Sequence, residues 1–184
     1  TSPLAAALLI SLWGLMAACG PSWDGARLRD EQTRRGEAIV DLSTSLRVSA
    51  TRLTPDLAAA LAERRCDARQ CGDERSALVA AARERATRET SFALAVYTAR
   101  QAWNDLDAGD SRWTVSLLVD GARVDPSAIR AIRDLDAQAR LFPDVDGFDK
   151  TYELSFPAGT TGSKALSLVI SGLQGELRLD WRGP

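Results

Sequence analysis

The sequence predicts a mainly β protein: an antiparallel β-sandwich, immunoglobulin-like or transthyretin-like, with a two-helix excursion between early strands. Apolar and polar residues alternate in a series of short segments, as in strands with one buried and one exposed face. Between the first two segments, residues 55–90 are rich in alanine and arginine and lack this alternation. We expect a single domain over residues 39–184, with the helical insertion at about 55–90.

The first and longest alternation lies at residues 40–51. Apolar or β-branched side chains hold most of its even positions, from Val40 to Ala50, and polar side chains hold the odd ones. Such a pattern over a dozen residues indicates a half-buried strand.

Two helices are expected next. Thr54 can cap the first, and Pro55 suits its first turn. Asp73 can cap the second. In each helix a few apolar residues four apart share a narrow face, so this pair should lie on the domain rather than form its core.

The alternation then returns repeatedly. The later predicted strands are residues 92–96, 113–119, 151–156, 166–170 and 177–181. Residues 126–140 leave two alternatives open: a helix that begins at Pro126, or an edge strand followed by a loop.

The beginning of the chain predicts export. Residues 4–18 are uncharged and apolar, too few to span a bilayer but typical of a signal peptide, which we expect over residues 1–18. We expect residues 19–38, which are polar and charged, to form a tether, and a short helix within residues 26–35 is left open as an alternative.

The stretch "LMAACG", with Ala17 and Ala18 directly before Cys19, resembles the lipobox of bacterial lipoproteins. Met16 departs from it, because the family favours Leu there. The resemblance implies a diacylglycerol on Cys19, which anchors the chain in a membrane of the cell envelope. Gly20, where an Asp often retains lipoproteins at the inner membrane, favours the outer membrane. The alternatives are an ordinary signal peptide or an N-terminal helix with an incidental cysteine.

The composition of the chain excludes several kinds of catalytic site, metal site and partner. The chain has no histidine, which excludes Ser-His-Asp and Cys-His catalysis and histidine-ligated metals. The formal charge of −2 gives no basic excess, so we expect no nucleic-acid partner. We expect no enzymatic activity and no cofactor.

Cys66 and Cys71 remain as a pair. In an exported chain an even number of cysteines indicates a disulfide. Two thiols without histidine or further cysteines do not complete a metal site, so we expect no metal there.

Two acidic loops are candidate ligand sites, and their carboxylates are Asp105, Asp107, Asp110, Asp144, Asp146 and Asp149. Closely spaced carboxylates suit calcium, but neither loop matches the EF-hand pattern, and Asp also clusters in ordinary turns. Trp103 and Trp113 flank the first loop, as aromatic rings do in glycan sites, although both can instead pack on the domain.

The segments from Trp103 to the end of the chain resemble uncharacterised bacterial envelope lipoproteins, which implies no activity. The sequence therefore favours a non-catalytic envelope lipoprotein, acting as a structural or protein-interaction module with a protein partner. The alternative is a module that binds calcium or glycan through residues 103–112 and 143–150.

Overall fold

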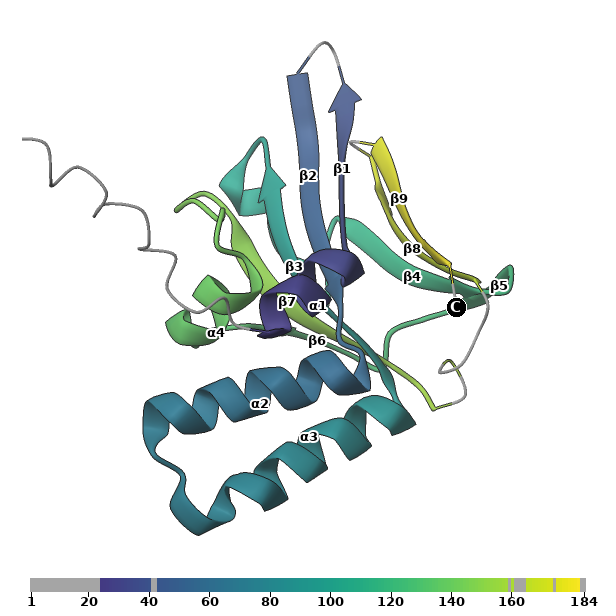
Figure 1. Ribbon diagram of the computed structural model, residues 1–184. Helices are drawn as coiled ribbons and strands as arrows, with labels where there is room; N and C mark the ends of the chain where they lie inside the picture. The colour runs from purple at the N-terminus through teal and green to yellow at the C-terminus, as the bar shows by residue number, and fades with distance from the viewer. Residues whose placement is uncertain (1–23, 41–42, 159, 161–164, 174, 183–184) are drawn as a thin grey trace, which may run out of the picture.

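The computed structural model describes residues 24–40, 43–158, 160, 165–173 and 175–182 (Figure 1). The strands are β1 (Thr33–Val40), β2 (Ser43–Arg52), β3 (Thr90–Thr98), β4 (Trp113–Val119), β5 (Ala122–Val124), β6 (Ala128–Ala131), β7 (Lys150–Phe156), β8 (Ala165–Gly172) and β9 (Gly175–Arg182). The helices are α1 (Asp24–Gln32), α2 (Pro55–Arg69), α3 (Arg75–Arg88) and α4 (Leu135–Leu141), with 3₁₀ turns η1 (Gly72–Glu74) and η2 (Gln101–Trp103).

The strands form two antiparallel sheets, in the orders β1-β2-β3-β7-β6 and β5-β4-β8-β9. This confirms the predicted fold class: a mainly β sandwich with a helical insertion between early strands. Each of the five later predicted strands lies within or overlaps an observed strand.

The core lies between the sheets. Phe92 of β3 packs edge-to-face on Phe156 of β7, with ring centroids 5.9 Å apart, and lies 4.9 Å from the ring of Trp181 in β9. All three side chains are fully buried, and large rings in such arrangements contribute strongly to core stability. The alternation of apolar residues thus marks the inward face of each sheet.

The predicted tether is wrong for residues 24–38, which form α1 and most of β1; α1 overlaps the alternative of a short helix within residues 26–35. β1 pairs with β2 along its length and lies against β9 of the other sheet. Gly36 faces Leu177 and Leu179, and Ala38 belongs to the same core cluster. The inward residues of this strand are therefore small, and its alternation is weak. The predicted strand at residues 40–51 is confirmed from residue 43 onward, but Val40 belongs to the preceding strand.

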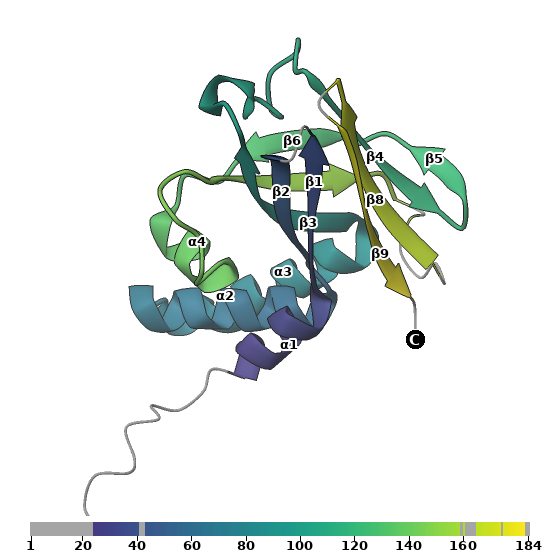
Figure 2. The same ribbon diagram turned by 90° about the horizontal axis from the view of Figure 1, so that it is seen from above.

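The helical excursion packs on one end of the outer face of the five-stranded sheet, with α2 and α3 side by side (Figures 1 and 2). The predicted cap of α2 is confirmed, since Thr54 Oγ1 accepts a hydrogen bond from the Leu57 amide at 3.3 Å. The predicted cap of α3 is wrong, because Asp73 lies in η1 and Glu74 precedes the helix. α3 is the outer helix: none of its described residues is buried.

For residues 126–140 the edge-strand alternative is confirmed and the helix at Pro126 is wrong, although a helix follows the strand where a loop was expected. β6 is an edge strand beside β7, and α4 follows after a short link. Asp134 begins this helix by accepting hydrogen bonds from the amides of Asp136 and Ala137, at 3.0 and 3.3 Å. α4 then places Leu141 and Phe142 against Ala93 and Ala95, where they form a second, smaller core.

Among the described residues, no helix is long and apolar enough to cross a membrane. The predicted signal peptide and Cys19 lie outside these residues.

Candidate functional site

The two acidic loops adjoin at one end of the sandwich, which we call the loop end. β3 runs into the first loop and β7 begins after the second, and Val96 pairs with Lys150 where these strands meet. The Lys150 ammonium donates to the backbone carbonyl of Asn104 at 2.6 Å. Loops far apart in the sequence are therefore fastened together.

Asn104 anchors the first loop in the interior. Its side-chain amide donates to the Val96 carbonyl at 2.5 Å, and its side-chain oxygen lies 2.9 Å from the Tyr152 hydroxyl. Burial raises the pKa of Tyr152, and the nearby carboxylates of Asp107 and Asp105 raise it further. The tyrosine thus stays protonated and serves as a buried hydrogen-bond donor.

The carboxylates of the first loop point mostly to solvent. Asp105 accepts a hydrogen bond from the Ser111 hydroxyl at 3.0 Å, and both Asp107 and Asp110 are exposed. These interactions are typical of a polar turn.

The flanking tryptophans have different roles. Trp113 is buried in the core, and its ring nitrogen donates to the Trp103 carbonyl at 2.7 Å. The Trp103 ring interacts with the guanidinium groups of Arg100 and Arg112, whose central carbons lie 4.7 and 5.9 Å from its centroid. Trp103 therefore packs against arginine at the end of the strand.

The second loop contacts arginines of the β1–β2 hairpin. The closest nitrogen of Arg47 lies 3.5 Å from Asp149 and 3.7 Å from Asp146, and Arg35 lies 3.4 Å from Asp144. Burial raises the pKa of Asp149, although the Asp146 amide and Arg47 act in the opposite direction. These contacts hold the loop against the sheet.

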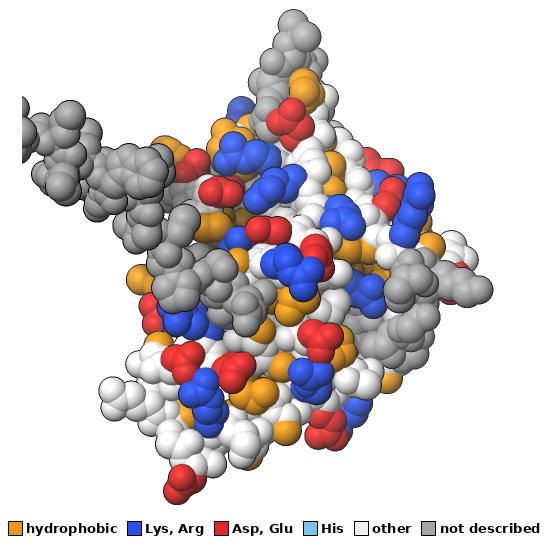
Figure 3. Space-filling view, in the orientation of Figure 1, with side chains coloured by type: hydrophobic (Ala, Val, Ile, Leu, Met, Phe, Trp, Pro, Cys, Tyr) orange, Lys and Arg blue, Asp and Glu red, His pale blue; other side chains and the backbone are white. Residues whose placement is uncertain are grey.

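A groove of 470 Å³ lies between this loop and the outer face of the five-stranded sheet. Its lining includes the small residues Ser49 and Ala95 of the sheet, and Phe142 and Val145 of the loop. Its charged groups come from α1 and the β1–β2 hairpin on one side and from the second loop on the other: Arg29, Arg35, Glu37, Arg47, Asp144, Asp146 and Asp149. Figure 3 shows acidic and basic side chains side by side over this region, without a large field of one sign.

The predicted calcium ligands do not converge. Among the described residues, no three or more histidine, cysteine or acidic side chains are grouped closely enough to hold a metal ion. Asp146 accepts a hydrogen bond from the Phe148 amide at 2.9 Å, and Asp149 accepts one from the Asp146 amide at 3.3 Å. In this structure these carboxylates bind the loop's own backbone and the arginines.

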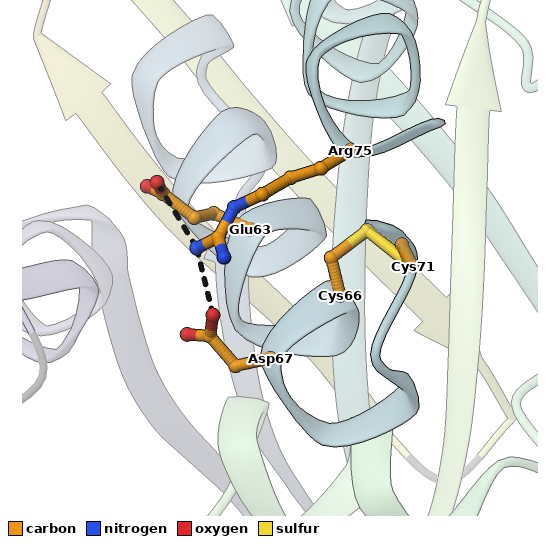
Figure 4. The surroundings of a disulfide bond; sticks show 5 residues. All are labelled: Glu63, Cys66, Asp67, Cys71 and Arg75. Carbon is orange, nitrogen blue, oxygen red and sulfur yellow. Dashed lines mark hydrogen bonds and ion pairs between the residues drawn. A yellow bond between two sulfur atoms is a disulfide. The ribbon is translucent and has the colours of Figure 1, made fainter. Parts of the chain in front are cut away.

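The cysteine pair lies outside the loop end, at the turn between α2 and α3. Cys66 and Cys71 are joined by a disulfide, with Cα atoms 4.9 Å apart (Figure 4). Beside it, Arg75 lies 2.7 Å from Asp67 and 3.4 Å from Glu63, so an ion-pair cluster also connects the two helices.

Arg35 and Arg47 are among the groove residues that the sequence did not predict. Their strands lie side by side, and both side chains reach the second acidic loop on the outer face. The only signal for Arg35 is the weak alternation of small residues at Gly36 and Ala38 with charged ones around them.

Fold and site together define a β-sandwich with a charged groove beside one end. No protein-family model matches the chain. No curated protein matches it either.

Proposed function

We propose that this chain is a non-catalytic lipoprotein of the cell envelope, whose β-sandwich is a protein-interaction module held near a membrane by lipid on Cys19. The groove beside the loop end is its binding surface. An envelope protein is the partner, and the outer membrane is the favoured location.

The observation that carries the interaction role is the pairing of the charged groups in the groove. Arg35 and Arg47 face the carboxylates of the second loop, and Glu37 also has a partner. General acids, bases and nucleophiles work with a free or strongly perturbed group in reach of a substrate. A groove of paired charges with small residues between them is better suited to binding than to chemistry.

Exposed apolar residues in the second loop and in the β1–β2 hairpin also support binding. Phe148, 68 % exposed, lies in the second loop, and Ile39, 60 % exposed, lies near the tip of the β1–β2 hairpin. Aromatic residues are enriched among those that contribute most to protein–protein binding.

The proposed lipidation rests on the "AAC" motif at residues 17–19. Replacing Cys19 with serine should release the chain from the membrane fraction or leave its signal peptide uncleaved.

The interaction is tested by photo-crosslinking in intact cells, with benzoylphenylalanine in place of Phe148. We expect an adduct of one defined mass. Benzoylphenylalanine in place of Leu78, which is 45 % exposed on α3, is the matched control and should give none. Adding Asp144→Lys, which reverses an exposed groove charge, should abolish the Phe148 adduct. Equal labelling at both positions, or no adduct at Phe148, would contradict the proposal.

A second candidate is a module that binds calcium or glycan at the loop end. The two acidic loops adjoin there, although their described carboxylates do not group closely enough to hold a metal ion. Melting curves in calcium and in chelator separate the candidates, because a ligand that binds only the folded state raises its stability. Under the interaction proposal the calcium and chelator curves of each protein should coincide, both for the wild type and for the triple variant Asp144→Asn, Asp146→Asn and Asp149→Asn. A wild-type curve that rises in calcium, beside a variant curve that does not, would favour calcium.

A further inference from the structure

A second cavity lies at the other end of the sandwich from the acidic loops. Its volume is 330 Å³, and it lies where β2 leads into α2 and α3 leads into β3. We call it the foot cavity. It is lined by Arg52, Leu53, Thr54, Pro55, Ala86, Thr87, Glu89 and Thr90, none of which lines the groove.

Arg52 is a half-buried cation in this cavity. Its guanidinium makes no hydrogen bond or ion pair with any residue that the structure describes, and burial lowers its pKa. Removing a charge from water is costly unless a partner compensates. Arg29, whose side chain is 14 % exposed, shows the usual solution: it lies 2.8 Å from Asp30 and donates to the Arg140 carbonyl.

Thr90 supplies a second unpaired donor. It is 3 % exposed, and its hydroxyl is the one buried side-chain polar atom in the described part of the chain without a hydrogen-bond partner. Buried hydroxyls are rarely left unsatisfied, so such an atom indicates a missing partner.

Arg52 and Thr90 lie on the same face of the sheet. Arg52 pairs directly with Phe92, and Thr90 is two residues before Phe92 on the same strand. Residues two apart on a strand share a face, and diagonal neighbours across two strands are within reach of a long side chain. Both residues therefore lie on one face at the same end of the sheet, and both line the foot cavity.

The other polar groups of the cavity are already engaged. Glu89 lies 3.9 Å from Arg85, and the Thr87 hydroxyl donates to the Arg83 carbonyl. The Thr54 hydroxyl oxygen accepts a hydrogen bond from the Leu57 amide of α2, and its own proton takes no part in that bond. Among the described residues of this cavity, the groups without a partner are thus the Arg52 guanidinium, which only donates, and the Thr90 hydroxyl, which can donate.

We propose that the foot cavity binds a small organic oxyanion, a carboxylate or a phosphate ester. Arg52 would hold it through two parallel N–H···O bonds, the geometry in which guanidinium recognises such groups, and Thr90 would donate a third. The volume is at the lower end of the range for small-molecule sites.

The test is thermal melting of the full chain, with sodium acetate or sodium phosphate replacing sodium chloride at equal ionic strength. The active anion should raise the melting temperature by about 3–6 °C at roughly ten times its Kd. Which salt acts distinguishes a carboxylate from a phosphate ligand.

Arg52→Met keeps the length of the side chain and should abolish the rise. Arg64→Met, which changes an exposed arginine of α2 without an ion pair among the described residues, should leave it intact. Thr90→Val keeps the side-chain shape; it should melt no lower than the wild type in chloride and lose most of the rise. No rise with either anion, or a full rise in Arg52→Met or Thr90→Val, would overturn the proposal.

Discussion

Replacing Gly36 with alanine tests whether β1 is part of the sandwich. A β-carbon at this position would lie 2.7 Å from a terminal methyl of Leu177 and 3.1 Å from one of Leu179. Both leucines are at least 93 % buried, so the new methyl group would enter a packed region. If residues 19–38 were a tether, the added methyl group would contact no packed side chain and stability would not fall.

The cost follows from the overlap. Ordinary contacts begin near 3.4 Å, so one side chain or β1 itself must move by about 0.7 Å. Overpacking of this kind lowers the free energy of unfolding by about 1–3 kcal/mol. Replacing glycine with alanine also raises it by about 0.4–1 kcal/mol, because alanine restricts the unfolded chain. We expect Gly36→Ala to lower the free energy of unfolding by about 1–2 kcal/mol, which corresponds to about 2–8 °C in melting temperature.

Urea unfolding of the full chain measures this difference, with Gly109→Ala as the control. Gly109 has no atom within 4 Å of an added β-carbon, so its alanine variant should be as stable as the wild type or slightly more stable. If Gly36→Ala were as stable as Gly109→Ala, the placement of β1 against β9 would be refuted.

Three further predictions concern other parts of the fold. Gly172→Ala should cost about 1–3 kcal/mol in urea unfolding, because its β-carbon would lie 2.7 Å from a backbone carbonyl and 2.9 Å from the Trp113 ring; an unchanged midpoint would contradict this. Mass analysis before reduction should find Cys66 and Cys71 joined. Reduction of this disulfide should then lower the free energy of unfolding by about 2 kcal/mol and loosen the helical excursion without unfolding the sandwich. Identical melting curves for the oxidised and the reduced protein would count against a stabilising disulfide. Because burial raises the pKa of Asp149, its ionised form destabilises the folded state at neutral pH. Asp149→Asn should therefore be more stable than the wild type at pH 7, and the gain should disappear below about pH 4; a gain that grows in acid would show the opposite sign.

The sequence predicted the strands whose inward residues are large. In β3, β7 and β9, Phe92, Tyr152 and Trp181 alternate with smaller or polar residues, so the period of two is visible. β1 also alternates, but its inward residues include Gly36 and Ala38, because β9 approaches closely there. A pattern that relies on large apolar side chains does not detect a strand whose inward side chains must be small.

The candidate site was predictable only in part, for a related reason. The acidic loops were predicted from the sequence around each of them. The role of Asp144, however, depends on its ion pair with Arg35, which is 109 residues away in the sequence. That pairing exists because β1 and β2 lie in the same sheet as β3 and β7. Without β1 in the fold, carboxylates in a turn suggest either solvent or calcium, and an arginine partner is not foreseeable.

β1 therefore links the stability of the sandwich to the shape of the groove. Gly36 faces the leucines of β9, while its neighbours Arg35 and Glu37 line the groove on the opposite face. A strand alternates its faces, so any displacement that relieves the inward contact also moves the outward side chains. Because Arg35 and Asp144 are already 3.4 Å apart, a shift of a few tenths of an ångström is enough to weaken their interaction. Gly36→Ala should for this reason weaken the crosslink from position 148 even under conditions where the variant remains folded, whereas Gly172→Ala, in the other sheet, should cost stability and leave the crosslink of the folded protein unchanged.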